Sequence, residues 1–194
     1  ELVFSAHPLG RNILGTEASV KNIKKEDFLK FVKTHLDFER IVFSCVGNIS
    51  EKKIHRLIKK YFDHLIPRNS LRNRLFFSDY QPKQEEQRRE ISQVHYLMGL
   101  PAYNLHAPER IPFYLLTNIL GGPGMNSRLN LNLREKHGFV YGVEAQFSSY
   151  IDTGLFSIGF ATDPVNFKRS KSLINQELNK LKQIRMGVRQ LHVA

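Results

Sequence analysis

Apolar residues at regular spacing divide the chain into a first helix–strand–helix unit, a polar segment and a second unit. Helical spacing predicts a helix over 25–35, with one apolar face formed by Phe28, Phe31, Val32 and His35. The continuous apolar run Ile41–Val46 predicts a short buried strand, closed by Gly47-Asn48. Ser50 is placed to cap the next helix, whose apolar face holds Ile54, Leu57, Ile58 and Tyr61. We expect this unit to end at Pro67.

Residues 68–90 break the periodicity with Arg, Gln and mixed charge, which is typical of a linker. Beyond it, the apolar run Val94–Leu100 predicts a strand that ends at Pro101. Pro108 suits the first turn of a helix that runs to Leu120. After a glycine-rich loop, Asn126 or Ser127 begins a short helix through Leu129, Leu131 and Leu133.

The last part of the second unit predicts two strands and a helix. The strands are Tyr141–Ser149 and Gly154–Ala161, and so short a connection predicts antiparallel pairing. Asp163-Pro164 begins a helix with Ile174, Leu178 and Leu181 on one face. The predicted fold class is α+β, a two-layer arrangement with helices on a mostly antiparallel sheet.

Composition excludes some classes of protein. The 29 basic and 18 acidic residues give a net charge of +11, but no nucleic-acid-binding motif accompanies it, so a solvated basic surface is favoured. No apolar run reaches the ~18–20 residues of a membrane helix. The single cysteine, Cys45, is predicted to be a small buried apolar residue. The sequence gives no signal for a cellular compartment, and we favour the cytoplasm. We interpret both ends as cuts in a longer protein.

Motifs for known chemistry are few. The histidines form neither His-x-x-Glu-His nor zinc-finger spacing, so no metal site is predicted in this segment. The loop Gly121–Gly124 lacks the Lys-Ser/Thr of a phosphate loop. Arg134 and Tyr141 remain: forked Arg donors can hold a peptide carbonyl or carboxylate, and a Tyr hydroxyl can donate to a developing oxyanion. A surface Arg beside a half-buried strand Tyr is the alternative interpretation.

Four segments in order carry a resemblance to known proteins: His7–Thr16, Gly121–Leu129, Leu133–Tyr141 and Asp152–Phe156. Their sequences resemble the pitrilysin/insulinase family of zinc peptidases, in its shorter bacterial and mitochondrial-processing form. It implies that zinc and its ligands, including an inverted His-x-x-Glu-His motif, belong to a segment preceding Glu1, where zinc activates water. It also implies that Arg134 and Tyr141 contact the substrate, and that Gly122 and Gly124 are further candidate substrate-binding residues.

By the same resemblance, residues 1–66 are the end of a first peptidase-like domain, 67–90 a linker, and 91–194 the beginning and middle of a second domain without zinc. We expect 25–65 to stand in for the missing end of the second domain, giving one hybrid domain within or between chains. The expected function is the substrate-contacting segment of a zinc metallopeptidase acting on unfolded or extended peptides, as a dimer or paired subunit. This segment alone should be inactive. The alternative is a non-catalytic partner or core subunit of the same family, and nucleic-acid binding is disfavoured.

Overall fold

We analysed a computed structural model of the chain, which describes residues 1–35, 41–63, 75–187 and 191. The chain forms two compact units. One comprises Glu1–Arg11 and Phe76–Ala194, and the other comprises Asn12–Leu75. The sheet and the candidate site lie in the first of these units.

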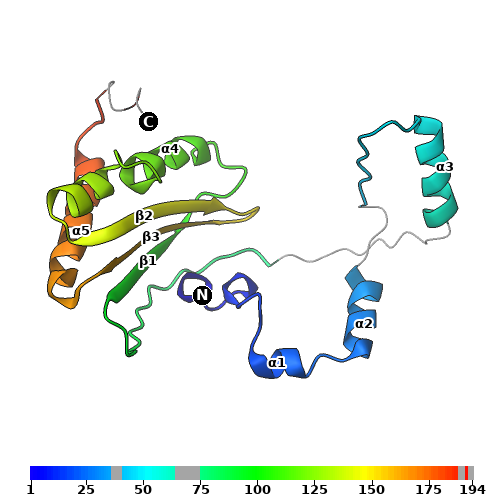
Figure 1. Cartoon of the computed structure of the whole chain (residues 1–194), viewed down its shortest axis with the longest axis horizontal. Coiled ribbons are helices and arrows are strands. Elements are labelled where there is room, and N and C mark those ends of the chain that lie inside the picture. The colour runs from blue at the N-terminus through cyan, green and yellow to red at the C-terminus, as the bar shows by residue number, and fades with distance from the viewer. Residues whose placement is uncertain (36–40, 64–74, 188–190, 192–194) are drawn as a thin grey trace. The chain divides into compact units, whose positions relative to one another are not determined.

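A three-stranded antiparallel sheet forms the centre of the first unit (Figure 1). Its strands are β1 (Val94–Ala102), β2 (Val140–Ser149) and β3 (Gly154–Thr162). The spatial order is β1-β3-β2, so β3 is central and β1 and β2 form the two edges. The antiparallel pairing of β2 with β3 and the α+β fold class are confirmed.

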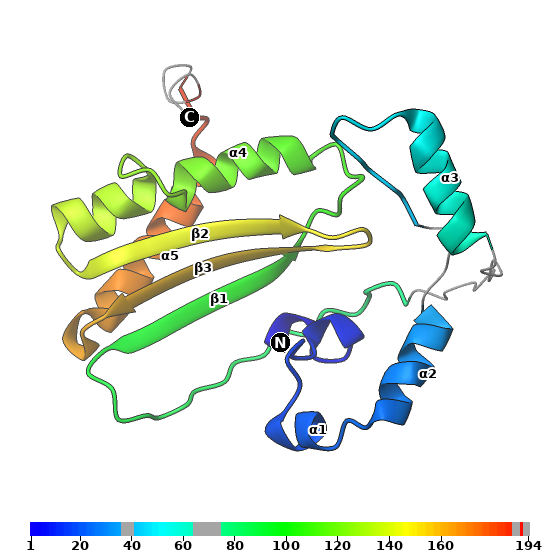
Figure 2. The ribbon, with the colours of Figure 1, turned by 45° about the vertical axis from the view of Figure 1, so that its right-hand side comes forward.

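Helices cover one face of this sheet (Figure 2). They are α4 (Arg110–Gly121), the π-helix η4 (Asn130–Lys136) and α5 (Phe167–Gln183), which follows the 3₁₀ turn η5 (Pro164–Asn166). The core between the two layers is formed by apolar residues from all three strands and all three helices: Tyr96, Met98, Leu120, Leu133, Val140, Val143, Ala145, Phe156, Ile158, Phe160 and Ile174. Burial of this face is the main force that holds the layers together.

The predicted elements of this unit are present, with shifted boundaries. Strand β1 continues through Pro101 to Ala102, which an edge strand permits because its outer N–H groups need no partner in the sheet. Helix α4 begins at Arg110 rather than at Pro108. The short leucine-rich helix is confirmed as a helix, but most of it has π geometry. Ile174 on α5 is buried, as its predicted apolar face requires.

The N-terminal segment packs onto the same unit. It contains two 3₁₀ turns, η1 (Leu2–Phe4) and η2 (Pro8–Gly10). Phe4 is buried, and its ring meets that of Phe77 edge to face at 4.8 Å. The predicted linker therefore packs in part, since Phe77 anchors it to the N-terminal segment.

The second unit contains α1 (Glu17–Lys21), α2 (Lys25–His35) and α3 (Glu51–Phe62), so both predicted helices are confirmed. Ser50 precedes α3, but its side chain makes no capping bond. The predicted strand over 41–46 is wrong: these residues form no strand, and Val42 and Val46 are 89% and 100% exposed. Cys45 is exposed rather than buried. A strand needs a partner for its backbone groups, and this unit provides none among its described residues.

Some predictions fall outside the described residues. These are the end of the first helix–strand–helix unit at Pro67 and the linker over 68–74. Residues 75–90 form no helix or strand, as expected of a linker. Within the described parts of the chain, no helix has the length and apolar character to cross a membrane.

Candidate substrate-contact site

The structure brings Arg134 and Tyr141 together. Arg134 lies on the last turn of η4, and Tyr141 lies near the start of β2. The guanidinium carbon of Arg134 is 5.7 Å from the centre of the Tyr141 ring. Such a cation–π contact contributes about 0.5–1 kcal/mol at an exposed site. The pair therefore has a preferred arrangement while remaining accessible to a ligand.

Both side chains are available for binding. Tyr141 is 87% exposed, and among the described residues nothing forms a hydrogen bond with its hydroxyl. Arg134 makes one ion pair, from its Nε to Glu135 Oε1 at 3.6 Å, and both side chains are well exposed. An exposed pair of this kind stabilises the fold by at most about 1 kcal/mol, so a substrate carboxylate or carbonyl can replace it.

A β-bulge gives Tyr141 its exposed position. The register of β2 on β3 shifts between Val140 and Val143, which pair with Thr162 and Phe160. Three steps along β2 therefore match two along β3. Val140 and Val143 both face the core, and Tyr141 and Gly142 both face outward. Bulges often redirect a side chain next to a functional site, and this one points Tyr141 away from the core beside Arg134.

The turn between η4 and β2 is held by backbone bonds. Gly138 has a φ of 62°, the left-handed conformation expected for it as a helix cap. Its N–H donates to the carbonyl of Arg134 at 2.9 Å, and the N–H of Phe139 donates to that of Leu133 at 2.9 Å. The Thr162 hydroxyl on β3 donates to the Phe139 carbonyl at 2.6 Å. These bonds fix the distance between the two site residues.

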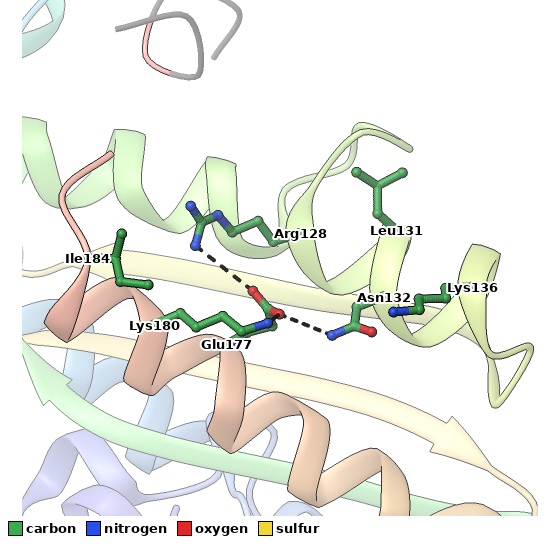
Figure 3. A pocket seen from close by; sticks show the side chains of 7 residues that line it. All are labelled: Arg128, Leu131, Asn132, Lys136, Glu177, Lys180 and Ile184. Carbon is green, nitrogen blue, oxygen red and sulfur yellow. Dashed lines mark hydrogen bonds and ion pairs between the residues drawn. The ribbon is translucent and has the colours of Figure 1, made fainter. Parts of the chain in front are cut away.

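A buried carboxylate attaches η4 to α5. Glu177 of α5 accepts a hydrogen bond from Asn132 of η4 at 3.1 Å, and it pairs with Lys180 at 2.7 Å and with Arg128 at 3.9 Å. Figure 3 shows these side chains in a pocket of about 420 Å³. Asn132 lies two residues before Arg134, so Glu177 helps to hold the helix that presents Arg134.

The glycine-rich loop lies at the end of α4. Gly122 is the C-cap of this helix, and a Cβ there would lie 2.7 Å from the carbonyl oxygen of Asn118. Gly124 accepts a hydrogen bond from the Ser127 N–H at 3.1 Å. At Gly124 an added Cβ would lie 2.4 Å from the side-chain oxygen of Asn126, so a larger residue fits neither position without a shift of its neighbours. Their candidate role in binding substrate remains a prediction.

Gly122 also borders a groove that the sequence did not reveal. The groove has a volume of about 260 Å³ and lies between α4 and β2. Its walls are formed by Tyr114, Thr117, Asn118, Gly122 and Pro123 on one side and by residues 144–148 of β2 on the other. The sequence hints at this groove only through the alternation of outward polar and inward apolar residues along β2. The crossing of α4 and β2 is a tertiary feature that a local pattern does not encode.

The described residues offer no donor set that fits zinc. Among residues 1–35, 41–63, 75–187 and 191, no three His, Cys, Asp or Glu side chains are grouped to hold a metal ion. Zinc needs three or four such ligands in a closed or catalytic site. No chemical step in these residues is therefore assigned to a metal.

Residues 22–193 match the family described as the peptidase M16 inactive domain. The chain therefore belongs to this family, and its resemblance to pitrilysin/insulinase-type zinc peptidases is confirmed.

The curated relatives are longer proteins. The chain is 29% identical over 160 residues to an uncharacterized zinc protease of Rickettsia bellii, covering 82% of this chain and 38% of that protein. It is 24% identical over 203 residues to a probable mitochondrial-processing peptidase subunit beta of Schizosaccharomyces pombe, covering 96% of this chain and 43% of that protein. The chain thus spans about two fifths of the length of these relatives.

The fold is similar to that of solved structures. A peptidase M16 inactive domain from Pseudomonas fluorescens matches with a TM-score of 0.86 and 19% identity, covering 98% of this chain and 46% of that one. A chain of complex III2 from Candida albicans matches with a TM-score of 0.79 and 17% identity, covering 98% of this chain and 47% of that one. At these identities the likeness concerns the fold alone.

Proposed function

We propose that this chain is the substrate-contacting, non-zinc segment of a zinc metallopeptidase that hydrolyses peptide bonds in unfolded or extended peptides. The observation that carries the proposal is the accessible Arg134–Tyr141 pair, held at 5.7 Å by a fixed turn and a bulge. The relatives named zinc proteases support zinc in the whole protein. Since these residues do not fit the metal, its ligands belong to another part of the protein or to a partner.

The two side chains are proposed to have different roles in binding the substrate. The Arg134 guanidinium offers parallel N–H donors to a peptide carbonyl or to a terminal carboxylate, which fixes the orientation of the substrate. The Tyr141 hydroxyl donates to the oxygen that gains negative charge as the peptide carbonyl becomes tetrahedral. The zinc site supplies the activated water. This chain positions the substrate and stabilises charge, and alone it hydrolyses nothing.

The alternative function is that of a non-catalytic partner or core subunit of the same family. The similar fold of a chain of complex III2 is compatible with it but does not favour it. The relative named as a processing peptidase subunit beta supports a paired-subunit arrangement in either case. A core subunit would keep the fold without depending on the Tyr141 hydroxyl, so the two functions differ in how they respond to its removal.

Tyr141→Phe tests the proposal in the zinc-bearing full-length protein. Loss of the donated hydrogen bond should lower kcat roughly 10²-fold, because the oxyanion loses one donor. Zinc content, measured by elemental analysis, should not change. Tyr103→Phe is the matched control, since its ring packs on Phe113 away from the pair. Unchanged turnover in Tyr141→Phe would contradict the proposal. The isolated chain, which is expected to be inactive, gives the baseline rate of the assay.

The hybrid domain also remains a proposal: residues 25–65 pack against the sheet-bearing unit, within or between chains. It is supported by the exposed apolar side chains that α2 and α3 present in their own unit, with no buried residue in either helix. Phe31→Ser should then lower the free energy of unfolding by about 3–5 kcal/mol, as for truncation of a buried Phe. Denaturation at two protein concentrations distinguishes packing within one chain from packing between chains, because only the second depends on concentration. No change in stability would contradict both, because Phe31 would then lie in solvent.

A further inference from the structure

Three consecutive residues of η4 contact three different parts of the unit. The side chain of Asn132 donates to Glu177 of α5 at 3.1 Å. The next residue, Leu133, is fully buried in the core. Arg134 then lies 5.7 Å from the ring of Tyr141 on β2. Residues one or two apart on a helix do not face each other, so these contacts together fix the rotation of η4 about its axis.

Asn132 is bonded on two sides. Its side chain reaches Glu177, as Figure 3 shows. Its carbonyl lies 2.7 Å from Nδ1 of His137, and this nitrogen donates, because a carbonyl can only accept. In a π-helix the backbone N–H five residues on would donate to that carbonyl, but the N–H of His137 donates to Arg134 instead. The imidazole therefore replaces a backbone bond in the turn that carries Arg134.

The acceptor on α5 is held firmly in place. The Glu177 side chain is 8% exposed, and Ile174 on the same helix is buried in the core. Lys180 Nζ lies 2.7 Å and Arg128 Nη1 3.9 Å from the carboxylate oxygens. Burying a carboxylate costs free energy unless such partners compensate it, so its position is well defined. Asn132 thus bonds to a fixed point on a helix that the core holds.

Arg134 depends on this support from its own helix. Its ion pair with Glu135 and its contact with the Tyr141 ring are both exposed, and exposed contacts of these kinds are weak. They do not hold the guanidinium if η4 turns. The π geometry of η4 is itself uncommon and is found most often at functional sites.

We propose that Glu177 and His137 are positioning residues for Arg134 and that both act through Asn132. Glu177 fixes the rotation of η4 from α5, and His137 closes the last turn of the helix. The proposal rests on the substrate-contacting role proposed above for Arg134, and it adds the residues that set the geometry of that site. The competing role is a structural one, in which Glu177 stabilises the packing of η4 on α5 without affecting Arg134.

NMR of the 194-residue chain tests the geometry without zinc or substrate. Protons over an aromatic ring are shielded, so the Tyr141 ring should shift resonances of the Arg134 side chain upfield, and Tyr141→Leu gives the unshifted reference. Glu177→Ala should move these resonances most of the way to the reference, and Asn132→Ala should do the same. Gln176→Ala replaces an exposed neighbour on α5 and should leave them in place.

A double-mutant cycle in the zinc-bearing full-length protein tests the consequence for activity. Glu177→Ala should lower kcat/KM roughly tenfold, as misplacement of an orienting group does. In an Arg134→Ala background the same change should have no further effect, because a positioning residue acts only through the residue that it positions. Glu177→Gln should recover most of the activity, since its amide oxygen can still accept from Asn132.

His137→Phe tests the second positioning residue in the same cycle. The Phe ring can keep the contact with Phe139, which the imidazole makes at 5.2 Å, but it has no N–H for the Asn132 carbonyl. This variant should lower kcat/KM less than Glu177→Ala does, because the His137 bond is exposed. The loss should again vanish in the Arg134→Ala background, and a loss that persists there would remove His137 from the proposal.

Four results would overturn the role of Glu177. They are unmoved resonances in Glu177→Ala, additive losses in the cycle, equal losses in Glu177→Gln and Glu177→Ala, and an equal loss in Gln176→Ala. If Glu177→Ala does not fold, Asn132→Ala carries the same tests, since it removes the same bond from the other side. If Arg134→Ala leaves turnover unchanged, the proposed function fails, and the NMR shifts still decide whether Glu177 positions Arg134.

Discussion

Arg134→Ala should lower kcat/KM of the zinc-bearing full-length protein roughly 10³-fold, the largest effect expected at the candidate site. The change removes both the charge and the forked donors that orient the substrate. It should leave the fold intact, because the ion pair with Glu135 and the contact with Tyr141 are exposed and together contribute only about 1–2 kcal/mol. Kinetics with a peptide substrate measure the loss, and zinc content checks that the metal site is unaffected.

Two further variants sharpen this test. Arg134→Lys keeps the charge but loses the parallel donors, so it should recover only a part of the lost activity. Arg169→Ala removes an exposed arginine of α5 outside the site and should behave like the original protein. If Arg134→Ala and Arg169→Ala gave equal kinetics, Arg134 would be a surface residue without a role in substrate binding.

Gly121→Ala should lower the free energy of unfolding by about 3 kcal/mol, because the added methyl group overpacks the contact between α4 and β2. Gly121 ends α4 where this helix crosses β2. A Cβ there would lie 2.8 Å from both the Cβ and the backbone N of Ala145. A backbone atom of a paired strand cannot move away without disturbing the sheet. Helix and strand must therefore separate, and the higher helix propensity of alanine does not compensate.

Urea denaturation of the full chain measures this effect. Gly142→Ala is the matched control, because nothing lies within 4 Å of the added Cβ at that position. It should change stability by less than about 0.5 kcal/mol, as surface substitutions do. Equal stability of the two variants would mean that α4 and β2 do not pack as closely as the structure shows.

The elements that sequence predicted best are those whose pattern is local. The alternation in β2 and β3, the short turn between them and the apolar face of α5 each depend on neighbouring residues, and all three are present. The apolar run 41–46 has an equally strong local pattern but forms no strand. Whether such a run becomes a strand depends on a partner elsewhere, which periodicity does not encode.

The candidate site was only partly visible in the sequence. Arg134 and Tyr141 were singled out first by their hydrogen-bond donors and then by family resemblance, and the structure adds their contact and the bulge beside it. The groove between α4 and β2 was missed, because it depends on the close crossing at Gly121 and Ala145. The hydrogen bond from Asn132 to Glu177 joins residues that are 45 positions apart in the sequence. A single sequence carries no signal for pairing at that separation.

The bulge in β2 also bears on how this strand can vary in length. Without Gly142, Val140 and Val143 would be two positions apart, and ordinary alternation would still point both toward the core. Loss of one codon here therefore leaves the buried valines in register, whereas at most other points of a strand it would turn every later side chain over.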